Sequence, residues 1–235
     1  MLDRHTFGRM TDTGHAAEDF IGAIASEALF ADFVHLRPTA VVNGQQRELC
    51  DLLIVLDEQA IAFEIKSQAS QRDGGDEHDW FRKNLKKAAS QLSGASRMIP
   101  RAAITATNRI GQSIAWQPGQ LKMAHGVALF QVDGRHAVPN TVARRSKSGA
   151  WLQFLSFTDF MNIARHLGTF PDVVDYLSAR SQIPVWATPD VDVEQDAYGY
   201  YLTHAHVFPP TIGSADFDGQ WADSYGELAH TSLPS

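Results

Sequence analysis

The chain has 235 residues, of which 44% are hydrophobic and 20% are charged. This composition excludes a disordered or fibrous protein, and it allows one substantial core or one domain with an appendage. No stretch approaches the roughly 20 apolar residues of a membrane helix, and the first residues, MLDRHTFGRMTD, lack the apolar centre of a signal peptide. Cys50 is the one cysteine, which excludes an internal disulfide, so we expect a cytoplasmic protein with no membrane partner.

Charge is unevenly distributed along the chain, although the net charge is only −7. Residues 1–79 hold 6 Lys/Arg and 15 Asp/Glu, whereas residues 80–132 hold 8 Lys/Arg and no acid. Residues 133–180 add 6 bases against 4 acids, and residues 181–235 hold 8 acids and no Lys or Arg. An acidic region beside a basic one suits a metal site that also holds a polyanion. Chance and solvated helix faces are the alternative explanation for the basic stretch.

Hydrophobic periodicity predicts helices and strands in alternation. In chain order they are a helix at 14–31, strands at 33–42, 48–56 and 60–68, a helix at 79–95, shorter strands at about 101–106, 113–117 and 126–133, and helices at 157–168 and 171–181. Pro38 is expected to break its strand, Asp79 to cap the second helix, and Gly94 to lie near the end of that helix. Residues 198–202 are a further, aromatic strand candidate.

This order predicts an α/β fold with an αβββαβ core, in which one mixed central sheet is flanked by helices. We expect the core at residues 1–135 and a helical extension packed on it at 136–185. An acidic, irregular C-terminal segment is expected at 186–235. That tail is either a solubilising end, a partner surface or a segment that folds back as a phosphate mimic.

Three charged residues on the two central strands are expected to meet. Glu64 and Lys66 are two residues apart, so they project from the same face of a strand. If the hairpin connection is residues 57–58, Asp51 opposes Glu64; if it is residues 58–59, Asp51 opposes Lys66. Either register brings Asp51 to the same face, whereas a connection of odd length would turn it away. Cys50 is expected to face the other way, as a core residue.

Two adjacent carboxylates without a Cys or His cluster favour a hard cation, Mg²⁺ or its substitute Mn²⁺. Such an ion activates water and neutralises charge that develops on a phosphate. Lys66 could orient the attacking water, accept its proton or stabilise the transition state, and the sequence leaves these three roles open. A hairpin with a surface Glu–Lys pair is the alternative, but the apolar neighbours Phe63 and Ile65 favour a buried strand.

An Asp on one strand and Glu-x-Lys on the next resembles the PD-(D/E)xK nuclease superfamily, whose fold is restriction-endonuclease-like. The matching residues are Asp51 in LCDLLIV and Glu64-Ile65-Lys66 in FEIKSQ, and Cys50 stands where many members have Pro. The resemblance covers roughly residues 14–133.

The resemblance extends to residues on the two flanking helices. It implies that Glu18, on the helix before the sheet, and Gln91, on the helix after it, belong to the site. The set is most similar to the nuclease-related-domain and Mrr-like branches. By the same resemblance the main-chain carbonyl of Ile65 is a metal ligand, beside Asp51, Glu64 and Glu18.

The sequence therefore predicts a Mg²⁺-dependent nuclease that acts on DNA, in phage defence, restriction or repair. The expected phosphate contacts are the basic residues of the middle region, Lys83, Lys86, Lys87, Arg144 and Arg145. RNA as substrate, and a homodimer or larger assembly, stay open. The alternative is a catalytically silent nuclease-like module that binds nucleic acid or a protein partner.

Overall fold

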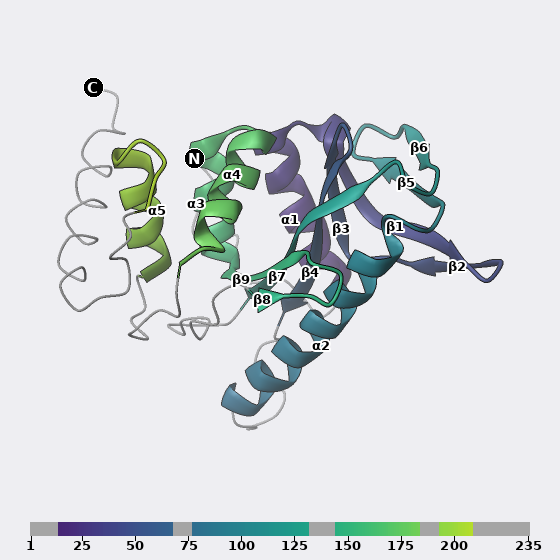
Figure 1. The fold of residues 1–235 in the computed structure, drawn as a ribbon, viewed down its shortest axis with the longest axis horizontal. Coiled ribbons are helices and arrows are strands. Elements are labelled where there is room, and N and C mark those ends of the chain that lie inside the picture. Colours follow the sequence, from purple (N-terminus) through teal and green to yellow (C-terminus); the bar gives the residue numbers. More distant parts are fainter. Residues whose placement is uncertain (1–13, 68–76, 132–143, 184–192, 209–235) are drawn as a thin grey trace.

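The structure is a computed structural model that describes residues 14–67, 77–131, 144–183 and 193–208. Within these ranges nine strands form one mixed sheet, and helices cover both of its faces (Figure 1). The strands are β1 (Val34–Val42), β2 (Gln45–Glu48), β3 (Leu52–Leu56), β4 (Gln59–Ser67), β5 (Ile104–Asn108), β6 (Ser113–Trp116), β7 (Lys122–Gln131), β8 (Arg144–Arg145) and β9 (Trp151–Ser156). The helices are α1 (Gly14–Leu29), the short 3-10 helix η2 (Ala31–Phe33), α2 (Glu77–Met98), α3 (Phe157–Leu167), α4 (Phe170–Arg180) and α5 (Val193–Thr203).

The strand order across the sheet is β6-β5-β1-β3-β4-β7-β9-β8, and β2 pairs with β1 alone. Strand β4 is parallel to β7 and β7 is parallel to β9, whereas the other pairs are antiparallel. The expected α/β class with one mixed, helix-flanked central sheet is therefore confirmed.

The two faces of the sheet have separate hydrophobic cores. Helices α1, α3, α4 and α5 pack with Ile61, Phe63 and Ile65 of β4 in one core. Helix α2 alone packs with Ala60 and Ala62 in the other. The alternation along β4 explains this division, because successive side chains point to opposite faces. Glu64 and Lys66 continue the row of Ala60 and Ala62 and so belong to the face covered by α2.

The hairpin of β3 and β4 has the first of the two expected connections, residues 57–58. Leu56 pairs with Gln59, so Asp57 and Glu58 form a two-residue turn, and Asp57 has a positive φ of 53°. This register places Leu52 opposite Phe63. Continued by one residue, the same register places Asp51, just before β3, opposite Glu64.

The predicted break near Pro38 is a β-bulge in β1. The pairing of β1 with β5 shifts register between Leu36 and Thr39, and Arg37 has a φ of 46°. A left-handed conformation is uncommon for a residue with a side chain. The bulge therefore sets the direction of the Arg37 side chain.

Several expectations for individual elements were wrong. Helix α2 extends from residue 77 to 98, so Asp79 and Gly94 lie inside it rather than at its ends. Residues 198–202 belong to α5 and not to a strand. Strands β8 and β9 lie in the span expected to be a helical extension, and β9 continues the central sheet beyond residue 135. The other residues of the expected C-terminal segment, 186–192 and 209–235, lie outside the described residues.

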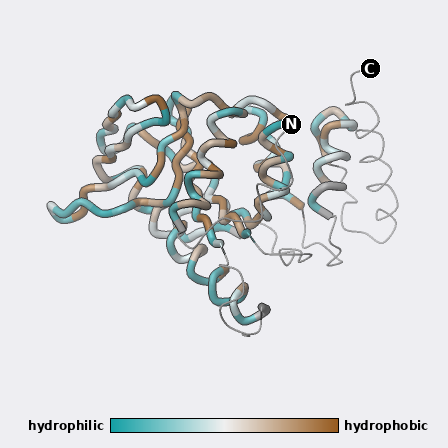
Figure 2. The backbone as a smooth tube through the Cα atoms, turned by 180° about the vertical axis from the view of Figure 1, so that it is seen from behind, coloured by the Kyte–Doolittle hydropathy of each residue, from teal (hydrophilic) through white to brown (hydrophobic). Residues whose placement is uncertain are grey.

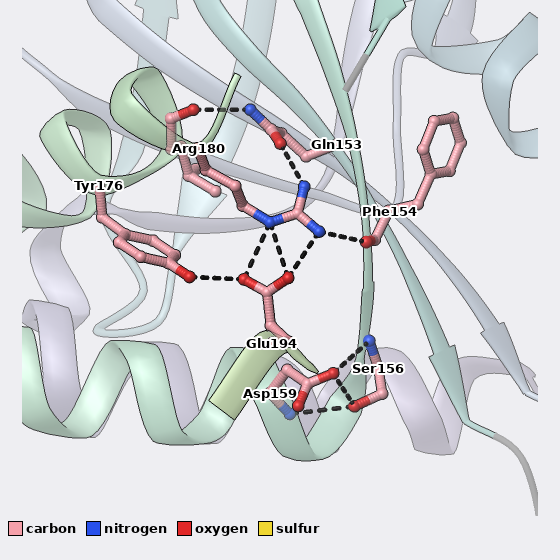
Figure 3. A network of polar contacts seen from close by, with 8 residues as sticks. Gln153, Phe154, Ser156, Asp159, Tyr176, Arg180 and Glu194 are labelled. Atoms are coloured by element: carbon pink, nitrogen blue, oxygen red, sulfur yellow. Dashed lines mark hydrogen bonds and ion pairs between the residues drawn. The ribbon is translucent and has the colours of Figure 1, made fainter. Parts of the chain in front are cut away.

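A buried polar network fixes α5 to the rest of the molecule (Figure 3). Arg180 donates through Nε to Glu194 of α5 at 2.8 Å, through Nη1 to Gln153 at 2.6 Å and through Nη2 to the carbonyl of Phe154 at 3.2 Å. The hydroxyl of Tyr176 donates to the same Glu194 carboxylate. Because every partner in this network is satisfied, we interpret it as structural.

None of the described helices has the length and apolar character needed to cross a bilayer.

The close packing of α2 on the sheet is testable with two glycines. A Cβ at Gly126 would lie 2.6 Å from Met123 Cε and 3.2 Å from Leu92 Cδ2 of α2, whereas a Cβ at Gly94 would meet nothing within 4 Å. We expect Gly126→Ala to lower the free energy of unfolding by about 1–3 kcal/mol. Gly94→Ala is the matched control and should raise it by about 0.5–1 kcal/mol through helix propensity. Urea denaturation measures both, and equal stability of the two variants would contradict the packing.

Candidate functional site

Asp51 is held between the two strands that neighbour β3. Its main-chain N–H donates to the carbonyl of Phe63 at 3.1 Å, and its carbonyl accepts from the N–H of Arg37 at 2.9 Å. Its carboxylate Oδ2 accepts from the N–H of Ile65 at 2.5 Å. The side chain therefore takes a position at the end of the β3–β4 ladder and lies against the Glu-x-Lys segment.

The three residues expected to meet do so around the amine of Lys66. Lys66 Nζ donates to Glu64 Oε2 at 2.7 Å and to the carbonyl of Ile65 at 3.3 Å, and it lies 3.6 Å from Asp51 Oδ2. Asp51 is only 7% exposed and Glu64 only 1% exposed. Three oxygens thus converge on one cationic atom in a mostly buried position.

Burial dominates the electrostatics of Glu64. Loss of solvation, followed by the nearby Asp51 carboxylate, raises the pKa of Glu64 to about 7, although the ammonium of Lys66 opposes the rise. Near neutral pH this carboxyl group is therefore poised between its acid and its base form. A perturbed pKa of this kind is typical of functional sites, although structural ion pairs produce it too.

Glu18 lies on α1 in a cluster of its own. Its carboxylate Oε2 is 3.4 Å from Arg37 Nε and 3.2 Å from His15 Nδ1. Arg37 also reaches Asp19, at 2.5 Å from Nη2 to Oδ1. The link from Glu18 to Asp51 is indirect, through the side chain and then the main-chain N–H of Arg37.

Gln91 lies on α2, the helix that packs against the face carrying Glu64. Its Oε1 is buried and has no hydrogen-bond partner among the described residues. None of the hydrogen bonds in the described part of the chain joins Gln91 to Asp51, Glu64 or Lys66. Gln91 is therefore an unused acceptor on the helix that covers the site's face of the sheet.

The expected basic residues lie on two elements. Lys83, Lys86 and Lys87 are exposed on α2, whose N-terminal end projects beyond the strands (Figure 1) and is predominantly hydrophilic (Figure 2). Arg145 is exposed on β8, and its guanidinium lies 4.7 Å from the ring centroid of Trp151. Arg144 also belongs to β8, but its side chain is outside the described part.

The sequence analysis missed two residues at this site. Glu48 was assigned to the same strand as Asp51, whereas it ends β2. Burial, and then the carboxylates of Asp51 and Glu18, raise the pKa of Glu48. Arg37 was not singled out at all, although an Arg–Pro pair at a predicted strand break was a signal for a bulge.

The expectation that Cys50 faces away from Asp51, toward the opposite core, was wrong. Cys50 is buried, as expected, but it packs in the core on the α2 side, and its Sγ lies 3.3 Å from the carbonyl of Leu52. The regular strand begins only at Leu52, so the alternation of a pleated strand does not extend back to residues 50 and 51.

The donor set matches the chemistry of a hard divalent cation. No group of three or more His, Cys, Asp and Glu side chains arranged for a metal ion occurs among the residues that the structure describes. Mg²⁺, however, is commonly bound by one or two carboxylates, with waters and substrate phosphates completing its shell. Asp51, Glu64 and the carbonyl of Ile65 already surround one cation, the Lys66 ammonium, so these residues fit such an ion.

Comparisons of the chain with protein-family models, with curated proteins and with solved structures found no significant match. The resemblance to a nuclease superfamily therefore depends on the residues of this chain alone.

Glu64 should make the metal-free protein less stable as the pH rises. Its folded-state pKa of about 7 exceeds the ordinary value of 4.5. Its contribution is therefore fully present below pH 4.5 and is lost as the pH rises through 7. Between pH 5 and pH 8 the wild type should lose on the order of 1–3 kcal/mol in its free energy of unfolding through Glu64, and Glu64→Gln should remove this loss. Urea denaturation at the two pH values, in the presence of a chelator, measures both proteins.

The control for this experiment is Glu27→Gln, which changes an exposed carboxylate on α1 and should retain the pH dependence of the wild type. Parallel pH profiles for wild type and Glu64→Gln would contradict the assignment.

Proposed function

We propose that this chain is a metal-dependent nuclease that hydrolyses phosphodiester bonds, with DNA as its substrate. The observation that carries the proposal is the convergence of Asp51 Oδ2, Glu64 Oε2 and the Ile65 carbonyl on Lys66 Nζ. Buried carboxylates are costly unless a positive charge offsets them, so their presence at the end of two central strands requires an explanation beyond packing.

In this proposal Asp51 and Glu64 bind Mg²⁺ or Mn²⁺, with the main-chain carbonyl of Ile65 as a third ligand. The ion would supply an activated water and neutralise charge on the phosphate. Glu64 must be deprotonated to bind it, so its pKa of about 7 makes metal affinity fall with decreasing pH below neutrality.

Lys66 is proposed to contact the phosphate. Hydrolysis joins a water oxygen to phosphorus and breaks one P–O ester bond, and negative charge grows on the phosphoryl oxygens as this happens. The Lys66 ammonium already lies beside the oxygens that would bind the metal. If a divalent ion took its place there, Lys66 would still be close enough to stabilise the charge on the phosphate. Gln91, with its unused Oε1, is proposed to accept a hydrogen bond from water at the site.

Helix α2 is proposed to hold the DNA backbone. Its exposed Lys83, Lys86 and Lys87 lie in a stretch without acids, on the helix that covers the site's face of the sheet. Arg145, Arg144 and the adjoining hairpin supply a second basic element, and the hydroxyls of Ser96 and Ser148 join this hairpin to α2 at 2.5 Å. Such contacts would position the backbone without reading sequence.

The central test is cleavage of circular plasmid DNA by Asp51→Asn. Asn keeps an oxygen acceptor for the N–H of Ile65 but removes the charge, so the fold should persist while cleavage in Mg²⁺ falls about a hundredfold or more. Asp175→Asn, an exposed change of the same kind on α4, is the control and should cut normally. Wild-type activity in Asp51→Asn would refute the proposal. Salt-sensitive DNA binding by the wild type without cleavage in any divalent ion would favour the silent binding module.

The role of α2 predicts a specific change in salt dependence. We expect replacement of Lys83, Lys86 and Lys87 by Gln to weaken DNA binding and to reduce the slope of log affinity against log salt by roughly 2–3. A charge-matched control replaces three exposed bases of the same acid-free stretch, Arg101, Arg109 and Lys122, and should change the slope less. Fluorescence anisotropy between 50 and 300 mM salt measures both, and equal slopes would contradict the assignment of α2.

A further inference from the structure

Arg37 has a backbone conformation that the surrounding structure imposes. Its φ of 46° lies in the left-handed region, Pro38 follows it, and the pairing of β1 with β5 shifts register at this point. Non-glycine residues adopt this conformation infrequently, and such outliers concentrate at functional sites. Its main-chain N–H also donates to the main-chain carbonyl of Asp51, so a hydrogen bond connects the bulge directly to the candidate site.

The Arg37 side chain is directed at α1. Nε lies 3.4 Å from Glu18 Oε2, Nη2 lies 2.5 Å from Asp19 Oδ1, and Nη1 lies 3.1 Å from His15 Nδ1. His15 Nδ1 is also 3.2 Å from Glu18. One nitrogen cannot accept from Arg37 and donate to Glu18 in the same state. The cluster is therefore not fully satisfied as it stands, and Glu18 depends on Arg37 for its counter-charge.

We propose that Arg37 is an internal counter-ion of the metal site, whose guanidinium balances Glu18 in the metal-free chain and competes with a divalent ion for that carboxylate. This inference rests on the proposed function, since it concerns the same metal. Arg37 is a positioning residue in this account, because it acts through Glu18.

The arrangement at Lys66 supports this inference. The carboxylates of Asp51 and Glu64 already have the Lys66 ammonium beside them, and Glu18 has the guanidinium of Arg37. Each carboxylate expected at the metal thus lies beside a cation of the chain itself, with Asp51 and Glu64 sharing Lys66. A divalent ion must displace or outweigh these cations, so they set the concentration at which it binds.

A structural role for Arg37 predicts the opposite effect. If Arg37 only holds Glu18 in the orientation that a metal needs, its removal weakens metal binding. If Arg37 competes with the metal, loss of its positive charge strengthens binding, because the remaining carboxylates attract a divalent ion more. A partly exposed ion pair such as Arg37–Glu18 contributes modestly, so the metal should bind about three- to tenfold more tightly when it no longer has to compete with Arg37 for this carboxylate.

The experiment is a calorimetric titration of Mn²⁺ into the full chain in the absence of DNA. Arg37→Gln and Arg37→Met should each bind Mn²⁺ about three- to tenfold more tightly than the wild type, and Arg37→Met serves if Gln destabilises the fold. Arg37→Lys keeps the charge and should stay within about twofold of the wild type. In a Glu18→Gln background, Arg37→Gln should have no effect, because the carboxylate for which Arg37 competes is absent.

Unchanged or weaker Mn²⁺ binding by both neutral variants would overturn the inference and leave the nuclease proposal intact. A gain in affinity that persists in the Glu18→Gln background would also overturn it, because the effect would then not pass through Glu18. If the wild type neither binds Mn²⁺ nor cleaves DNA, the proposed function fails and this inference fails with it.

Discussion

Two carboxylates buried at the end of a sheet cost free energy that only a nearby positive charge and hydrogen bonds can offset. In this chain the ammonium of Lys66 donates to Glu64, and the N–H of Ile65 donates to Asp51. The cost is still visible in the raised pKa of Glu64. The hairpin of β3 and β4 has to keep its register for this compensation to exist, since a slip of one residue would turn Glu64 into the opposite, apolar core.

The sheet supports that hairpin asymmetrically. Four helices cover one face and bury the large side chains of β4, whereas α2 alone covers the other, where Ala60 and Ala62 allow a close approach. The small residues end at Glu64, and α2 continues beyond the strands (Figure 1). The site therefore lies on the face that the basic helix α2 covers, beside a core that continues through Phe130 and Phe81. An acidic site and a basic helix come together through this geometry and not only through composition.

Local patterns were enough to predict the central part of the fold. Alternating apolar residues located β4, and either two-residue connection between the strands places Asp51 on the face of Glu64 and Lys66, so the sequence could bring these three residues together. Deviations from regular structure could not be predicted in this way. Strand β3 begins only at Leu52, so Cys50 does not follow its alternation, and the bulge at Arg37 depends on the pairing of β1 with both β3 and β5. The aromatic residues of α5 predict a strand because tyrosine favours strands. The segment is a helix, and the buried Arg180–Glu194 ion pair fixes its first turn to α4.

The bulge also changes how the site's electrostatics should be understood. Glu18 and Asp51 lie on different elements, and a regular β1 would give them no common partner. Because Arg37 adopts a left-handed conformation, its main-chain N–H donates to the main-chain carbonyl of Asp51 while its guanidinium forms an ion pair with Glu18. The strained residue thereby connects the two parts of the acidic site. A chain that stores positive charge inside such a site can fold stably without a metal and still offer a divalent ion its carboxylates when one is present.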